Sequence, residues 1–174
     1  GMNQLQPLTP GEIVLLQSPP RETMLSLVVA LALNGPVLAL DANNQFDAYR
    51  VARLLRRQTA DLDRVLEWVR VARAFTSYQV VALFEQLPAA AIPHVVFDLT
   101  ATFYDESVAP GESRRLLGVV LAHVRRLAEV APIVISARPP GNGQRADLLA
   151  LVAQSADRRL MWETPAAAAP ARLF

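Results

Sequence analysis

The residues able to do chemistry in this sequence are few, and their types exclude several kinds of site. All seventeen basic residues are arginine, because the chain contains no lysine, and it contains no cysteine either. This composition excludes Schiff-base or acid–base chemistry by lysine, thiol nucleophiles, disulfides and cysteine-ligated zinc. The two histidines, His94 and His123, have no second histidine or carboxylate at ligand spacing. We therefore expect both histidines to be structural and expect no metal site.

The elements that position the other polar residues follow from short apolar runs that alternate with helical periodicity. The runs predict strands at 13–16, 37–41, 68–72, 94–98, 133–136 and 158–162, with helices at 23–34, 48–58, 77–87, 112–130 and 145–154. Because the strands are apolar throughout, we predict an α/β fold of three layers, a mainly parallel sheet with helices on both faces. Ligands of such sheets bind beyond the carboxyl ends of the strands, so the loops after residues 16, 41, 98 and 136 are where a site is expected.

The overall composition indicates a folded chain whose net charge is too small to create a strong electrostatic field. Of 174 residues, 52% are hydrophobic and 19% are charged, and the net charge is +1. We expect one domain over residues 1–163 and an Ala/Pro-rich tail over 164–174. The charge gives no global attraction for nucleic acid or an acidic membrane. Outside the tail, the longest apolar run, 27–33, is far too short to span a bilayer, so we expect a cytoplasmic protein and no membrane contact.

Four blocks of sequence occur in the order of a known family. They are Val37-Leu-Ala-Leu-Asp-Ala-Asn-Asn-Gln-Phe-Asp-Ala-Tyr-Arg50, Val65-Leu-Glu-Trp-Val-Arg-Val-Ala-Arg-Ala-Phe-Thr-Ser-Tyr78, Val95-Val-Phe-Asp98 and Ile133-Val-Ile-Ser-Ala-Arg138. Together they resemble the ATPase core of the RecA/RadA recombinase family from residue 10 to about residue 163. The first is similar to the family's strand ending in Asp-Thr-Glu-Gly-x-Phe, the third to its Walker B strand, and the fourth to its Thr-Asn-Gln sensor strand. The resemblance implies a RecA-like P-loop NTPase fold, the cofactors ATP and Mg²⁺, and a role in DNA repair or recombination.

The stretch at the family's phosphate-binding loop lacks the groups that such a loop needs. Residues 17–23 read Gln-Ser-Pro-Pro-Arg-Glu-Thr. Pro19 and Pro20 stand where glycines would supply N–H donors, and Glu22 stands in place of the lysine. Arg21 could bind phosphate in the lysine's stead, although its neighbour Glu22 suggests an ion pair instead. The conformation of this stretch, an open nest of N–H groups or a collapsed turn, decides between these readings.

The other positions implied by the resemblance are only partly retained. Asn43 replaces the glutamate that activates water, and Arg138 replaces the sensor glutamine. Thr23 and Asp98 still match magnesium-associated positions. The simpler readings are that Thr23 caps a helix and that Asp98 is an acid satisfied by backbone N–H groups at a strand end. We assign no catalytic residue.

Two surfaces are candidates for contact with a larger partner. Arg138 and Arg145 bracket a short loop at the place of the family's longer DNA-binding loop, and we expect at most weak DNA binding there. Leu173 and Phe174 end the tail, either as a frayed terminus or as a docking peptide.

These observations favour a non-catalytic RecA-like protein, a pseudo-ATPase that binds a protein partner or a second copy of itself and needs no cofactor. The alternative is an ATP-binding or weakly ATP-hydrolysing protein that uses ATP and Mg²⁺ and is associated with DNA. A DNA-binding module is a third reading.

Overall fold

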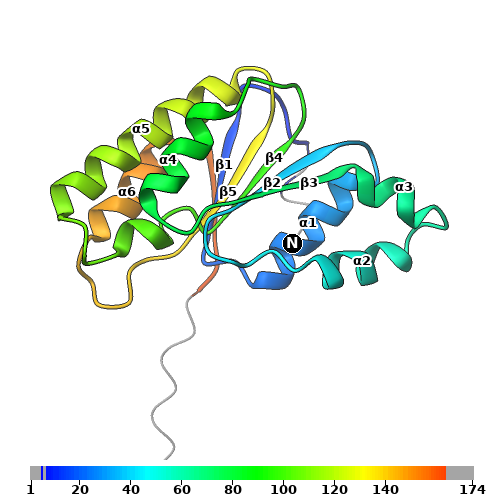
Figure 1. The fold of residues 1–174 in the computed structure, drawn as a ribbon, viewed down its shortest axis with the longest axis horizontal. Helices are drawn as coiled ribbons and strands as arrows, with labels where there is room; N and C mark the ends of the chain where they lie inside the picture. The colour runs from blue at the N-terminus through cyan, green and yellow to red at the C-terminus, as the bar shows by residue number, and fades with distance from the viewer. Residues whose placement is uncertain (1–4, 6, 164–174) are drawn as a thin grey trace, which may run out of the picture.

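A computed structural model describes Leu5 and residues 7–163 of the chain (Figure 1). Strands and helices alternate along it, as the sequence predicts. The elements are β1 Ile13–Gln17, α1 Arg21–Ala32, β2 Val37–Asp41, α2 Ala48–Arg56, α3 Leu62–Glu67, β3 Val69–Arg73, α4 Ser77–Gln86, β4 His94–Phe97, the 3₁₀ helix η2 Ala101–Tyr104, α5 Pro110–Ala128, β5 Ile133–Ala137, α6 Ala146–Ser155 and β6 Arg158–Met161.

The six strands form one sheet in the order β3-β2-β4-β5-β1-β6, and every pairing between them is parallel. The predicted parallel α/β sheet is confirmed. In register, Ile13 pairs with Ile133 and Leu40 with Val96, which places apolar runs side by side in the centre. The edge strands β3 and β6 carry the exposed residues Val71 and Met161.

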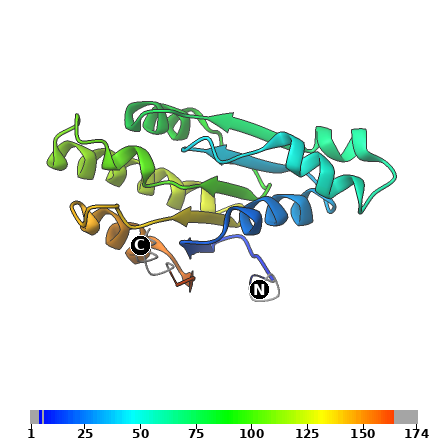
Figure 2. The same cartoon turned by 90° about the horizontal axis from the view of Figure 1, so that it is seen from below.

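Helices cover both faces of the sheet, as Figures 1 and 2 show. One core cluster joins alternate strand residues such as Leu15 and Ile135 to α4, α5 and α6, and the other joins Val14 and Val134 to α1, α2 and α3. Successive residues of a strand point to opposite faces, so a strand covered on both sides must be apolar at every position.

Two short elements were not predicted, and some boundaries differ. The helix α3 has six residues, too few to show a 3.6-residue period, and η2 is a single turn. The helix α1 begins at Arg21, two residues earlier than expected, after Pro20. Thr23 therefore lies inside the first turn, and the prediction that it caps the helix is wrong. The ring of Pro20 fixes its φ near the helical value, and proline has no backbone N–H group that would need an acceptor. The helix can therefore begin directly after Pro20.

The predictions about the tail and about the membrane can be compared with the structure only over the residues that it describes. The tail over 164–174, with Leu173 and Phe174, lies outside the described residues. Within residues 5 and 7–163, no helix is both long enough and apolar enough to cross a membrane.

Candidate functional site

The loops that the sequence singles out meet at one edge of the sheet. The strands β2, β4, β5 and β1 are consecutive neighbours, and all are parallel, so their carboxyl ends lie together. The fold brings Asn43, Asp98 and Arg138 to this edge, next to the start of α1.

The connection from β1 to α1 is a closed turn of three residues, Ser18, Pro19 and Pro20. The only backbone N–H among them is that of Ser18, which has a left-handed φ of 57° and donates to the Ala137 carbonyl at 2.9 Å. The Pro19 carbonyl accepts a hydrogen bond from the Arg138 guanidinium. The turn itself therefore has no backbone N–H group left to bind an anion such as phosphate.

The charged residues after this turn face away from each other. Glu22 forms an ion pair with Arg50 of α2 at 2.6 Å, while Arg21 donates from Nε to the Gln45 carbonyl at 3.0 Å. The prediction of an ion pair between Arg21 and Glu22 is therefore wrong. Consecutive side chains on a helix point in directions about 100° apart, so each one pairs with a different part of the neighbouring loop and helix.

Asp41 at the end of β2 organises the loop that follows it. Its buried carboxylate accepts from the backbone N–H groups of Asn43, Gln45 and Phe46, at 3.2, 3.0 and 2.8 Å. It also accepts from Nη1 of Arg73 at 2.5 Å, and this side chain donates through Nη2 to the Phe46 carbonyl at 3.1 Å. Asp41 and Arg73 therefore hold the ends of β2 and β3 together and fix the backbone that presents Asn43.

Asp98 and Asn43 contact one another directly. The Asn43 side-chain amide donates to Oδ2 of Asp98 at 2.7 Å, and the Asp98 backbone N–H donates to the Ser136 hydroxyl at 2.8 Å. Asp98 is only 8% exposed. Burial raises the pKa of its carboxyl above the ordinary value, against the opposing effects of Asn43 and of the positive charge on Arg138. The carboxylate is thus satisfied by a side-chain amide, and not by the backbone N–H groups expected for it.

Arg138 closes the same corner from the end of β5. Its backbone carbonyl accepts from Thr100 at 3.2 Å and from the Tyr104 hydroxyl at 2.6 Å. The cavity between Arg21, Asp98 and Arg138 has a volume of about 10 Å³, which is room for at most one water molecule. Typical small-molecule sites measure roughly 300 to 1,000 Å³, so this corner is too small in this conformation for a nucleotide.

Arg145 is anchored away from this corner. Its guanidinium donates to the carbonyls of Phe103, Asp105 and Val108, at 3.1, 2.9 and 2.5 Å, and to the Ser113 hydroxyl at 3.0 Å. Arg145 and Arg138 therefore use N–H donors inside the protein, which leaves the prediction of DNA contact at these two residues without geometric support. It remains an untested prediction.

A second hollow lies beside the same sheet edge, past the end of β3. It has a volume of about 230 Å³ and is lined by residues that include Asn43, Ala74, Phe75 and Thr102. Phe75 is 66% exposed there. This hollow was not predictable from the sequence, because it forms between loops that are distant along the chain.

The polar residues of this site are not arranged as a set of metal ligands. Over the part of the chain that the structure describes, no group of three or more histidine or carboxylate side chains is placed to share a metal ion. Asn43, Asp98 and Arg138 were predicted from the sequence as site residues, but Asp41, Arg73 and Ser136, which position them, were not. Asp41 and Asp98 each end a predicted strand, and these two acids were the signal in the sequence that polar partners would be found at this sheet edge.

No protein-family model matches the sequence. The structure shows a parallel α/β protein whose candidate site is a small corner at the carboxyl edge of its sheet, where the polar side chains bond to one another.

Proposed function

We propose that this chain is a RecA-like protein without ATPase activity that acts in DNA repair or recombination by binding a protein partner. The order of its sequence blocks supports the relationship. So does the position of Asn43, Asp98 and Arg138 at one sheet edge beside the turn before α1, because that is where the resemblance requires a nucleotide site to form.

The observation that carries the proposal is the closed turn between β1 and α1. A phosphate-binding loop works because several backbone N–H groups converge on the phosphates next to a lysine. Here two of the three turn residues are prolines, the third donates its N–H to Ala137, and the position of the lysine is a glutamate bound to Arg50. These residues fit ATP and Mg²⁺ poorly, so we derive no catalytic step through them.

The acid–base positions support the same conclusion. Asn43 stands where the resemblance implies a glutamate, and an amide cannot accept a proton from an attacking water. Its side chain instead donates to Asp98, the acid at the magnesium-associated position. Each residue thus satisfies the other, which suits a structural contact better than a catalytic one.

Exposed apolar side chains on the β3 side of the molecule provide the surface for a partner. Val71 on the edge strand is 40% exposed, and Phe75 just after that strand is 66% exposed. Phe75 also borders the hollow of about 230 Å³. The free side of an edge strand, next to an exposed aromatic side chain, is suited to receive another chain.

The test of the catalytic part is a phosphate-release assay with saturating Mg-ATP. The proposal predicts no release above that of an Asp98→Ala variant, which serves as the preparation control. Turnover that is lost in the Asp98→Ala protein would instead support the ATPase alternative.

The test of the partner surface begins with a second copy of the chain as the occupant. Sedimentation velocity over a range of protein concentrations is expected to show reversible association, and a Val71→Arg, Phe75→Ser variant is expected to sediment as a monomer. A Met161→Ser variant at the opposite edge is the matched control. Association of equal strength in all three proteins would contradict this surface.

A further inference from the structure

The surface of α2 that faces solvent carries an unusual density of positive charge. Arg50, Arg53, Arg56 and Arg57 all lie within the helix or at its C-cap, and all are exposed. The opposite face of the helix is buried through Val51 and Leu55. Together with Tyr49, which is 86% exposed, these four arginines form what we call the α2 arginine surface.

Most of this charge is not neutralised within the protein. Arg50 pairs with Glu22, but the side chains of Arg53, Arg56 and Arg57 form no ion pair or hydrogen bond with any residue that the structure describes. Residues 1–4, 6 and 164–174 contain no aspartate or glutamate, so no acidic side chain there can supply one. Two acids next to α2 are engaged elsewhere, because Asp47 caps α2 and Asp61 pairs with Arg64.

Helix energetics do not account for this arrangement. Like charges three and four residues apart repel each other on a helix. The helix dipole favours arginine in the last turn, which suits Arg53 and Arg56, but it disfavours Arg50 in the first turn. The charge is therefore better explained by something outside the chain.

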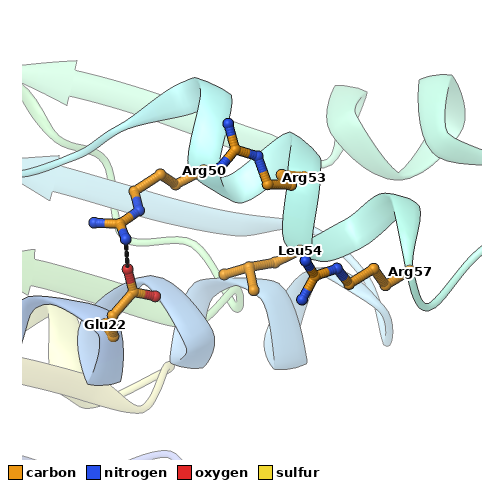
Figure 3. A pocket seen from close by; sticks show the side chains of 5 residues that line it. All are labelled: Glu22, Arg50, Arg53, Leu54 and Arg57. Atoms are coloured by element: carbon orange, nitrogen blue, oxygen red, sulfur yellow. Dashed lines mark ion pairs between the residues drawn. The ribbon is translucent and has the colours of Figure 1, made fainter.

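Three of these arginines border a hollow between α1 and α2, whose lining is drawn in Figure 3. It has a volume of about 190 Å³ and is lined by Glu22, Arg50, Arg53, Leu54 and Arg57. In Figure 3 Arg50 reaches across to Glu22, while Arg57 extends beside Leu54 without meeting a carboxylate. The hollow is smaller than a typical site for a whole small ligand, of roughly 300 Å³ or more, but it can admit a phosphate group.

The geometry points to single-stranded nucleic acid as the ligand of the α2 arginine surface, with backbone phosphates on Arg53, Arg56 and Arg57. From residue 50 to residue 57 the helix rises about 10 Å, a row of guanidinium groups that suits a strand with several phosphates. Tyr49 lies one helical turn before Arg53, where its exposed ring can stack on a base. Glu22 competes with phosphate for Arg50. This surface is separate from the corner formed by Asn43, Asp98 and Arg138, and binding to it does not depend on the absence of ATPase activity proposed above.

The experiment measures binding of a fluorescein-labelled oligodeoxythymidylate by anisotropy between about 50 and 200 mM salt. Three phosphate contacts on a single strand predict a slope of log K against log salt of about −2, a roughly 20-fold loss of affinity over this range. The affinity itself is expected to be no tighter than about micromolar at physiological salt.

Two variants test the arginines against a matched control. The Arg53→Ala, Arg57→Ala variant retains one contact, so its slope is expected to fall to about −0.7 with at least a roughly tenfold loss of affinity at low salt. The control, Arg70→Ala with Arg159→Ala, removes the same charge from strand positions whose side chains point to the sheet face opposite α2. It is expected to bind like the wild type. Equal behaviour of the two double variants would overturn the proposal.

Two further variants identify the ligand class. Glu22→Gln frees Arg50 and is expected to tighten binding and steepen the slope by about 0.7, a gain that misfolding could not produce. Tyr49→Ala is expected to weaken binding about tenfold with an unchanged slope, because stacking is not ionic. If Tyr49→Ala has no effect, and inorganic tripolyphosphate or polyglutamate displaces the oligonucleotide as well as unlabelled strand does, the surface takes polyanions in general and the nucleic-acid proposal fails.

Discussion

The side-chain amide of Asn43 donates a hydrogen bond of 2.7 Å to the carboxylate of Asp98, between the carboxyl ends of the neighbouring strands β2 and β4. In the RecA-like reading these two positions would activate water and support magnesium. In this protein they bond to each other, and the Ser136 hydroxyl holds the Asp98 backbone N–H.

The buried carboxyl of Asp98 is expected to reduce stability at neutral pH. Burial raises its pKa in the folded state above the unfolded value, so its favourable contribution is present at acid pH and is lost as pH rises through the folded pKa. Asp98→Asn removes this ionisation and suits the left-handed φ of 54° at this position. We expect the variant to be more stable by roughly 1 kcal/mol at neutral pH in urea unfolding.

The pH dependence of this difference provides the control. The advantage of Asp98→Asn is expected to vanish as pH falls to about 4, where the unfolded carboxyl also becomes protonated. A variant that is less stable than the wild type at neutral pH would show that the ionised carboxylate stabilises the fold.

The Asp41–Arg73 pair is expected to be a major contribution to stability at the site. The Asp41 side chain is fully buried, so Arg73→Ala leaves a buried charge with only its three N–H donors. We expect a loss of about 3 kcal/mol in the free energy of unfolding. Arg70→Ala, on the same strand but exposed, is the control and should change stability by no more than about 0.5 kcal/mol. Similar losses in the two variants would contradict the importance of the pair.

His94 is expected to make the protein less stable in mild acid. Its ring is buried, with Nδ1 at 2.7 Å from the Ile92 carbonyl and Nε2 without a partner. Burial lowers its pKa, so below about pH 6.5 the unfolded chain takes up a proton that the folded chain does not, and stability falls. Between pH 7.5 and 5.5 the wild type should lose about 1 kcal/mol more than His94→Gln, by urea unfolding at both pH values. His123 is present in both proteins, so its effect cancels; equal losses would refute the assignment to His94.

Arg145 is expected to act as a structural clamp on the segment before α5. Arg145→Ala removes four hydrogen bonds and leaves three carbonyls and the Ser113 hydroxyl without this donor. We expect a loss of about 2 kcal/mol and faster hydrogen exchange around Asp105 and Val108. Arg114→Ala removes an exposed pair with Asp147 and should cost less than about 1 kcal/mol. If Arg145→Ala does not change the free energy of unfolding, Arg145 is not a structural clamp and its guanidinium is available to bind nucleic acid.

The fold was predictable from sequence because its strands are continuous apolar runs, such as those at Ile13 and Ile133, which only a sheet covered on both faces can bury. The order of the strands was not predictable, since it depends on long-range packing. That order brings Arg73 to Asp41 and Asn43 to Asp98 across gaps of 32 and 55 residues. The error at Thr23 has a local cause, because the start of α1 is set by Pro20 and not by a side-chain cap.

We propose that the turn from Ser18 to Pro20 leaves this protein without a phosphate-binding loop. Titration of Mg-ATP into the protein by calorimetry tests it most directly. We expect no heat beyond dilution, because the turn offers no N–H group for phosphate and Glu22 carries a negative charge that is bound to Arg50. Low-micromolar binding that disappears in Arg21→Ala or Thr23→Ala would show that this protein binds ATP through these residues, as the ATP-binding alternative requires.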